Sequence, residues 1–331
     1  MPNILDVALK ANVSIATVSR VVNKSLHKVN PTTKERVLAV ISELDYRPNA
    51  LAKGLLMKKT MTIGIIIPDI SNPYYAEIVR GIQDVADQEG YAVTLHNTDS
   101  RQEGIIRYIY LLREKSADGI IFSGGIINGH ETLSILKELK ERVVVIGRHD
   151  VDFPAVMVDN TGGITQAVQH LIDIGHKRIG FIGGPDGSTT ALDRLTGFKD
   201  AMARSGLKFA PRLVKKGTWD PKSGYLLGTQ LLKAKRRPTA IIAANDQMAF
   251  GVIKAAKELG LMVPEDLAVV GFDNIPLSSY FNPSLTTVEI PMHDLGAASM
   301  RMLLNLISGE KFEKVKLFKT RLLVRGSTIK Q

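Results

Sequence analysis

Two short helical patterns separated by a break constrain this chain more than any other feature of its sequence. They occupy residues 4–23, which read ILDVALKANVSIATVSRVVN. Apolar residues recur at helical spacing before the break and again after it: Ile4, Val7, Ala8 and Ala11, then Val18, Val21 and Val22. The pattern predicts a helix, a tight turn and a second helix, and the alternative is a pair of helices from an ordinary bundle.

The residues at the break favour the first interpretation. Asn12 tolerates the left-handed backbone of a tight turn, Val13 can fill the angle between the helices, and Ser14 is a typical N-cap. Ala8 is small where the second helix must cross closely. The segment is therefore predicted to be a helix-turn-helix, whose second helix enters the major groove of DNA.

The predicted second helix carries few side chains that could read bases. With Ser14 as the cap, Ile15, Ala16, Thr17 and Arg20 fall on or near its exposed N-terminal part. Arg20 is the best candidate to donate two hydrogen bonds to guanine, whereas Ile15 and Ala16 can only pack against thymine methyl groups or sugars. Much of the direct base discrimination is thus expected from Arg20.

Positive charge is concentrated at the same end of the chain. The 331 residues have a formal net charge of +10. Residues 1–60 contain ten Lys and Arg against four Asp and Glu, so they carry +6, and the remaining 271 residues carry +4. A concentrated basic end indicates phosphate contacts. A solvated basic face is an equally good interpretation of the charge alone.

A third helix is predicted after residue 30. Asn30 is its expected N-cap and Pro31 its first residue. Val37, Val40, Ile41 and Leu44 form its apolar stripe, so three helices complete a small core. Residues 46–49 interrupt the pattern, and residues 50–56 allow two helical turns that are too short to be stable alone. We expect this linker to fold only when it is docked.

From Thr62 onward, runs rich in Ile and Val alternate with amphipathic helical stretches, which is typical of parallel α/β layers. Strands are predicted at 63–67, 93–96, 119–122, 143–146, 179–182, 240–244 and 267–271. The segment IIIPD at 65–69 is echoed by GFIGGPD at 180–186, so two similar halves with a cleft between them are expected. Ligands of such sheets bind beyond the carboxyl ends of the strands, which here carry Asp69, Arg148, Asn245, Asp246 and Asp273.

Other function classes find little support in the sequence. No apolar run approaches the roughly 18 residues of a membrane span, and the N-terminus lacks the pattern of a secretory signal. Cysteine is absent, and no G-x-G-x-x-G, Walker A, H-x-x-x-H or G-x-S-x-G string occurs. We therefore expect a soluble cytoplasmic protein that is not an enzyme, binds no metal and uses no cofactor.

The chain resembles the lactose-repressor (LacI/GalR) family of bacterial regulators. DVALKANVSIATVSRVVN, the helix at 31–45 and YRPNALAKGL occur in the family's order and spacing. The resemblance implies an α/β protein in which an all-α helix-turn-helix head is joined by a hinge helix to a two-lobed core like the periplasmic binding proteins. The implied parts are a head at 1–47, a hinge helix and linker at 48–60, and a core at 61–331, with lobes of about 61–160 plus 291–321 and about 161–290 plus 322–331.

The resemblance also implies which residues bind. Leu55 would insert into the minor groove and kink the duplex, the alternative being a plain linker whose leucines pack on the next domain. Further DNA contacts would come from Asn23, Tyr46, Asn49, Ala52 and Lys53. A sugar-like effector would meet Tyr74, Tyr75, Arg148, Arg194, Trp219, Asn245 and Asp273 in addition to Asp69. Arg148 departs from relatives with a carboxylate or a small residue there, which favours a sugar acid or a sugar phosphate. Arg194 and Asp273 could instead form an internal salt bridge.

The expected partners follow from this resemblance. They are near-palindromic double-stranded operator DNA, a small sugar, sugar acid or sugar phosphate, and a second copy of the chain, with no membrane. Tyr280 and Phe281 could lie at the subunit interface or in the core, and a dimer is favoured over a tetramer because no leucine-heptad tail follows. The expected function is a DNA-binding repressor controlled by its effector. Alternatives are a sugar-transport receptor, an α/β enzyme and a regulator whose signal is a phosphoprotein co-regulator.

Overall fold

The computed structural model describes residues 2–22, 29–46, 59–124, 134–136, 138, 142–149 and 152–329. The chain divides into two compact units, Met1–Met61 and Thr62–Gln331. They are called the head and the core below. No helix among the described residues is both long enough and apolar enough to cross a membrane.

The head contains the three predicted helices. They are α1 (Ile4–Lys10), α2 (Ile15–Val22) and α3 (Pro31–Glu43). Asn12 adopts the left-handed conformation with φ of 49°, and Ser14 Oγ accepts a hydrogen bond of 3.2 Å from the Thr17 N–H, as expected of an N-cap. The Asn30 side chain caps α3 at the Thr32 N–H (3.0 Å). The predicted turn between α1 and α2 and the predicted caps of α2 and α3 are therefore confirmed.

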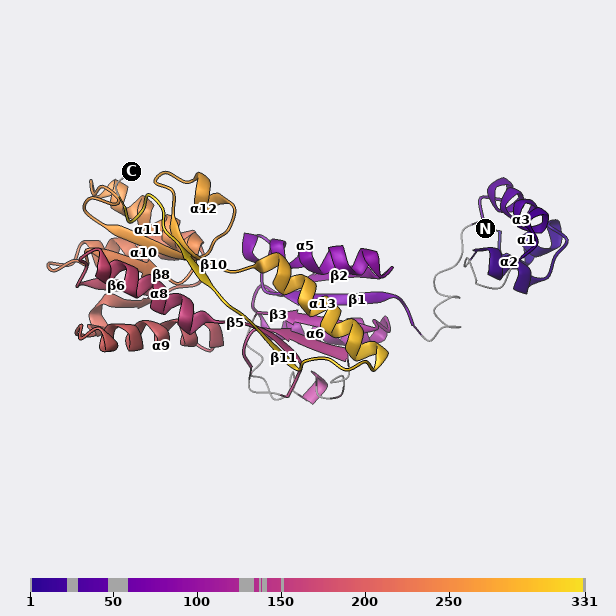
Figure 1. Cartoon of the computed structure of the whole chain (residues 1–331), viewed down its shortest axis with the longest axis horizontal. Helices are drawn as coiled ribbons and strands as arrows, with labels where there is room; N and C mark the ends of the chain where they lie inside the picture. The colour runs from indigo at the N-terminus through magenta and orange to yellow at the C-terminus, as the bar shows by residue number, and fades with distance from the viewer. Residues whose placement is uncertain are drawn as a thin grey trace. The chain divides into compact units, whose positions relative to one another are not determined.

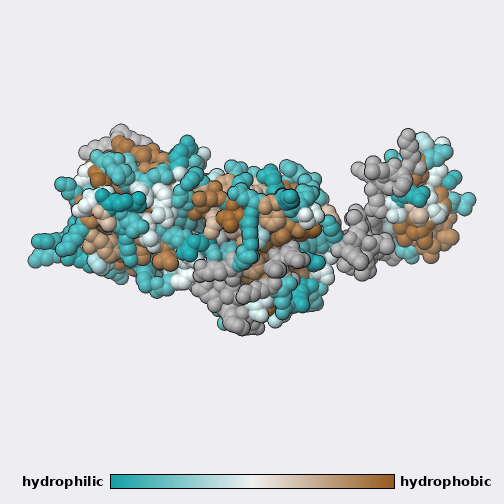
Figure 2. All heavy atoms as spheres, turned by 60° about the horizontal axis from the view of Figure 1, so that its bottom comes forward, coloured by the Kyte–Doolittle hydropathy of each residue, from teal (hydrophilic) through white to brown (hydrophobic). Residues whose placement is uncertain are grey.

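A small apolar core holds the head together. It consists of the buried residues Val7, Ala8, Ala11, Val18, Val21, Val37, Val40 and Tyr46. Each helix contributes, so the angle between α1 and α2 is set by packing against α3. The outer surface of the head also carries apolar side chains (Figure 2), namely Leu5, Leu9, Ile15 and Leu38.

The first lobe of the core is built on a parallel six-stranded sheet in the order β11-β5-β4-β3-β1-β2. Its strands are β1 (Thr62–Ile67), β2 (Ala92–Asn97), β3 (Gly119–Ser123), β4 (Val143–Ile146), β5 (Ala155–Val158) and β11 (Val315–Phe318). Its helices are α5 (Pro73–Gln88), α6 (Gln102–Glu114) and α13 (Met292–Ser308). The side chain of Leu112 on α6 packs at Gly64 and that of Leu303 on α13 packs at Gly119, on opposite faces of the sheet.

Helices α5 and α13 lie side by side at backbone contact (Figure 1). A Cβ atom on Gly81 would lie 2.0 Å from the His293 carbonyl oxygen, and one on Gly296 would lie 2.0 Å from the Ile78 carbonyl oxygen. Only glycine fits at either crossing point. The first lobe is therefore a tightly packed body.

The second lobe has a six-stranded sheet in the order β12-β10-β9-β8-β6-β7, parallel except for the antiparallel β12. Its strands are β6 (Ile179–Gly183), β7 (Val214–Lys216), β8 (Ala240–Ala243), β9 (Ala268–Asp273), β10 (Thr286–Glu289) and β12 (Arg321–Leu323). Its helices are α8 (Asn160–Asp173), α9 (Thr189–Arg204), the 3-10 turn η2 (Pro211–Leu213), α10 (Pro221–Leu232), α11 (Asp246–Glu258) and α12 (Leu277–Tyr280).

Every strand predicted from the sequence is present, and the α/β fold with two similar halves is confirmed. The chain crosses between the sheets three times: from β5 to α8, from β10 to α13 and from β11 to β12 (Figure 1). Two ion pairs tie these crossings together, Lys319 to Asp159 (3.3 Å) and Arg321 to Glu289 (2.8 Å). Side chains that follow the strand ends of both lobes can thus face a common space.

Candidate functional site

The second helix of the head presents the side chains that were predicted to read DNA. Ser14, Ile15, Ala16 and Arg20 are exposed and Thr17 is half-buried. Val18 and Val21 on the opposite face of α2 are buried in the head core. Arg20 is exposed, and within the part of the chain that the structure describes it forms no ion pair.

Of the other predicted DNA contacts, Tyr46 is the one that lies among the described residues. Tyr46 is only 9% exposed and packs in the head core, and its contact with DNA stays a prediction. Asn23, Asn49, Ala52, Lys53 and Leu55 lie outside the described residues. Their contacts stay predictions.

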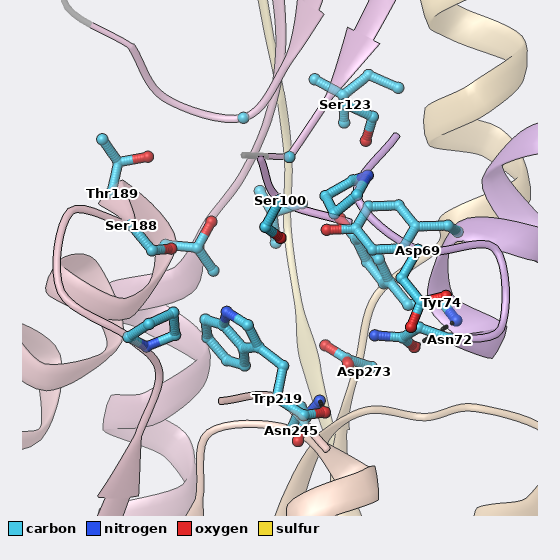
Figure 3. Close-up of a pocket in the computed structure, with 18 of the residues that line it drawn as sticks. Asp69, Asn72, Tyr74, Ser100, Ser123, Ser188, Thr189, Trp219, Asn245 and Asp273 are labelled. Carbon is cyan, nitrogen blue, oxygen red and sulfur yellow. Dashed lines mark hydrogen bonds between the residues drawn. The ribbon is translucent and has the colours of Figure 1, made fainter. Parts of the chain in front are cut away.

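The core contains a cavity of about 620 Å³ at the carboxyl ends of the strands, called the cleft below. It is lined from the first lobe by residues that follow β1 to β4, and from the second lobe by residues that follow β6 to β9. All eight residues predicted to meet an effector line it: Asp69, Tyr74, Tyr75, Arg148, Arg194, Trp219, Asn245 and Asp273. The labelled side chains surround an open space into which the Trp219 indole projects (Figure 3).

Arg194 on α9 is held in one orientation by the protein itself. Its Nη1 lies 3.3 Å from Asp273 Oδ1 and also donates to the Ala244 carbonyl, and its Nε donates to Asn160 Oδ1 (2.8 Å). The guanidinium carbon lies 3.7 Å from the centroid of the Phe272 ring. Of the two predicted alternatives, the internal contact between Arg194 and Asp273 is formed. Both residues also line the cleft, and their contact with a ligand stays a prediction.

Asp273, at the end of β9, is a buried carboxyl with a second one behind it. Burial raises the pKa of Asp273 to about 8, Arg194 opposes that rise, and Asp246 adds to it. Burial likewise raises the pKa of Asp246 to about 6. The Asp246 carboxyl accepts hydrogen bonds from the Thr287 hydroxyl (2.5 Å), the Ser278 hydroxyl (2.7 Å) and the Ile275 N–H (2.9 Å). Asp246 was expected at the strand ends, and the structure places it behind the cleft wall.

Trp219 and Asn245 form the base of the second-lobe side of the cleft. Asn245 caps α11, accepting from the Met248 N–H (2.9 Å) and donating through Nδ2 to the Trp219 carbonyl (2.9 Å). Trp219 has φ of 70°, and a Cβ atom on Gly184 would lie 2.1 Å from its ring. The missing side chain at Gly184 thus leaves the room in which the indole lies.

The first-lobe side of the cleft is formed by two tyrosines and a short loop. Tyr74 and Tyr75, in the first turn of α5, pack edge to face with ring centroids 5.0 Å apart. Burial raises the pKa of both phenols, so they remain protonated hydrogen-bond donors at physiological pH. Asp69 accepts from the Ser71 N–H (2.9 Å) and the Ser71 hydroxyl (2.7 Å), which closes the loop before α5.

Arg148 bridges the two lobes. It follows β4 in the first lobe, and its Nε and Nη2 reach the Asp193 carboxylate on α9 of the second lobe at 3.0 and 2.9 Å. Its carbonyl oxygen also accepts a hydrogen bond from the Thr189 hydroxyl (2.7 Å). The carboxylate opposite Arg148 therefore belongs to the protein, which the sequence pattern did not indicate.

Several cleft residues were missed in the sequence. Ser188 and Asp220 are the N-caps of α9 and α10, and Asn72 is that of α5. An Asn, Asp or Ser that caps a helix directly after a strand is the signal that could have found them. Ser100, Ser123 and Gln247 add further hydroxyl and amide groups without a comparable signal. In the described ranges, no group of three His, Cys, Asp or Glu could hold a metal ion.

Comparison with known proteins gives a consistent result along the whole chain. Residues 3–49 match the model of bacterial regulatory proteins of the lacI family, and residues 168–328 match a periplasmic binding protein-like domain. The chain is 42% identical to catabolite control protein A of Priestia megaterium over 93% of each chain.

Two solved structures show the same architecture. The lac repressor dimer bound to operator and the anti-inducer ONPF aligns with a TM-score of 0.90 and 31% identity, covering 99% of both chains. The complex of the transcriptional regulator CelR with cellobiose aligns with a TM-score of 0.76 and 30% identity, covering 99% of this chain and 100% of that one.

Proposed function

The chain belongs to the lacI family of bacterial regulatory proteins and is a DNA-binding transcriptional regulator, not an enzyme. On this basis we propose how the helix-turn-helix of the head and the cleft of the core cooperate. The head reads an operator through α2, and the cleft binds a small sugar-like effector that changes the arrangement of the lobes. The regulator acts as a repressor. Because its target is bacterial DNA, we place it in the cytoplasm.

One observation carries this proposal: a helix-turn-helix and a cleft with convergent polar groups occur in a single chain. The cleft combines the apolar indole of Trp219 with the amide of Asn245 and the carboxyl of Asp273. A sugar ring offers an apolar face to the indole and hydroxyl groups to the amide and the carboxyl. The cellobiose complex of CelR supports a ligand of this class.

We propose that the operator-bound form is a homodimer on a near-palindrome, since one α2 reads one half-site and the related lac repressor binds its operator as a dimer. On α12, Tyr280 is 85% exposed, which suits a subunit interface. Phe281 instead stacks on Phe250 with ring centroids 4.4 Å apart, within the subunit. Leu55 remains the predicted minor-groove wedge, and Asn23, Asn49, Ala52 and Lys53 the predicted further contacts.

The experiment has two stages on the full chain. A thermal-shift screen of sugars, sugar acids and sugar phosphates first identifies a ligand that raises the melting temperature, because a ligand that binds only the folded state stabilises it. Fluorescence anisotropy with an operator selected from random DNA then measures the dissociation constant with and without that ligand. An effector whose binding is coupled to operator binding should change this dissociation constant by roughly 5- to 150-fold. A ligand that binds tightly in the cleft and leaves operator affinity unchanged would contradict the proposal.

The phosphoprotein co-regulator remains the alternative signal. Calorimetry with the free ligand and no other protein separates the two cases. Coupling between cleft and operator in the purified protein supports a small effector. Ligand binding that alters operator affinity only when a second protein is added supports a co-regulator.

A further inference from the structure

We infer that the cleft selects an uncharged ligand, and that Asp193 sets this selectivity by occupying the guanidinium of Arg148. The inference rests on the proposed function and narrows its effector to a neutral sugar or polyol. It reverses the expectation from the sequence alone, in which Arg148 favoured a sugar acid or a sugar phosphate.

The geometry of Arg148 is the first argument. A guanidinium recognises a phosphate or carboxylate by two parallel N–H donors. In Arg148 one such pair, Nε and Nη2, already meets Asp193 at 3.0 and 2.9 Å. The side chains of Arg148 and Asp193 are 38% and 22% exposed, so the pair is partly shielded from water. An anionic ligand that bound this edge of the guanidinium would have to displace Asp193 and leave that carboxylate without its partner.

The second guanidinium is even less available. Arg194 donates to Asn160, to the Ala244 carbonyl and to Asp273, and its flat face lies against Phe272. Its side chain is 4% exposed. It therefore positions the cleft wall and is not a free anion receptor.

Charge is the third argument. The carboxylates of Asp69, Asp99 and Asp220 line the cleft together with Arg148 and Arg194. Asp193 is not part of the lining but forms an ion pair with Arg148. Even with Asp273 protonated, four carboxylates then stand against two guanidiniums. A phosphate group entering this space meets net repulsion as well as the cost of desolvation.

The helix N-termini at the cleft do not reverse this balance. An uncapped N-terminus attracts anions through its free N–H groups. Here α5, α9, α10 and α11 are each capped by their own side chain, from Asn72, Ser188, Asp220 and Asn245. Each cap takes one of the backbone N–H donors that a phosphate would need, and the cap of α10 is itself a carboxylate.

The hydroxyl, amide and phenol groups that remain suit a neutral polyol. Tyr74 and Tyr75 are protonated phenols, and Ser100, Ser123 and Thr189 supply hydroxyls to the lining of the cleft that contains the Trp219 indole (Figure 3). Each can donate and accept, as sugar hydroxyls do. None requires a charged partner.

The test uses inorganic phosphate as a probe, so it does not depend on knowing the effector. The full chain is compared with Asp193→Asn, Arg148→Gln and the double variant, by thermal shift in phosphate against chloride at equal ionic strength. Phosphate binding to the basic head is common to all four proteins and cancels. In chloride, Asp193→Asn should melt within a few degrees of the wild type, which shows that it is folded.

We expect Asp193→Asn to bind phosphate at least about tenfold more tightly than the wild type, because a charge-assisted hydrogen bond becomes available. The added Arg148→Gln change should abolish this gain. The inference is overturned if Asp193→Asn binds phosphate no better than the wild type. It is also overturned if Arg148→Gln alone weakens phosphate binding, since Arg148 would then be available despite Asp193.

A second arm compares glucose and ribose with their phosphate esters. The wild type should be stabilised by a neutral sugar more than by its ester, and a preference for the ester would overturn the inference. If no sugar stabilises the wild type, the proposed sugar effector is refuted, and the phosphate arm still decides the role of Asp193.

Discussion

Arg194→Met removes the guanidinium that lies 3.3 Å from Asp273 and retains much of the apolar stem. The substitution also removes the hydrogen bonds to Asn160 and to the Ala244 carbonyl. Both members of the ion pair are almost fully buried, so water cannot replace the lost partner. The resulting loss of stability should depend on pH, because the carboxyl of Asp273 can be protonated.

The sign follows from the pKa of Asp273, which burial raises to about 8. The folded protein holds this proton between about pH 4 and 8 while the unfolded chain has lost it, so this carboxyl's contribution to stability falls as pH rises. At pH 6 Asp273 is protonated in both proteins, and the variant loses only hydrogen bonds, about 1 to 3 kcal/mol. At pH 9 the wild-type carboxyl is ionised beside Arg194, whereas in the variant, which lacks the charge that lowers this pKa, it stays protonated. The loss therefore grows by about 1.4 kcal/mol per pH unit above about pH 8, to a total of about 2 to 4 kcal/mol at pH 9.

Thermal unfolding at the two pH values measures the difference. At about 2 to 4 °C per kcal/mol, the melting temperature should fall by about 2 to 12 °C at pH 6 and by about 4 to 16 °C at pH 9. Adding Asp273→Asn to Arg194→Met should remove the pH dependence. An equal loss at both pH values, or a dependence that survives in the double variant, would refute the reasoning.

Further substitutions test the head and the cleft separately. Arg20→Ala should relax discrimination at one base position at a cost of about 1 to 3 kcal/mol of binding free energy, whereas Lys59→Ala should weaken binding to every DNA sequence equally. Dissociation constants for the operator and its single-base variants measure the difference. If Arg20→Ala lowers the affinity for every sequence equally, Arg20 does not read a base. Ser14→Ala should lower the stability of the head by about 1 kcal/mol through loss of the α2 cap, measured by thermal melting. Gly184→Ala should displace the Trp219 ring and weaken effector binding at least about tenfold in calorimetry, while operator affinity without effector stays unchanged.

The elements with a strong local signal were predictable from the sequence. The head followed from caps and periodicity, and the central strands followed from runs of Ile and Val that are buried on both faces. Strand β10 was missed because it begins with two threonines. Thr286 and Thr287 are fully buried, and their hydroxyls are satisfied by Arg325 and Asp246, which lie 39 and 41 residues away. No local pattern reveals such partners.

The same limit applies to two side-chain contacts in the sites that the sequence did not indicate. Arg148 is paired with Asp193, 45 residues further along and in the other lobe, so its local sequence suggested a free cation. Tyr46 follows α3 in a segment typical of a DNA-binding linker, but packing of three helices draws its ring into the head core. In contrast, the residues at strand ends were predictable, because the topology of parallel sheets brings those ends together.

The late return of the chain to the first lobe has a consequence for its synthesis. Strand β5 ends at residue 158, but α13 and β11, which complete the first lobe, end at residues 308 and 318. At roughly 5 to 20 residues per second, the ribosome reaches the end of β11 about 8 to 32 seconds after that of β5. Before α13 has been synthesised, the sheet face that it covers is bare. All strands and helices of the second lobe except β12 are synthesised during this interval. The lobe synthesised first is therefore completed only after all of the second lobe except β12, and its exposed apolar face during that interval is where a chaperone would have to act.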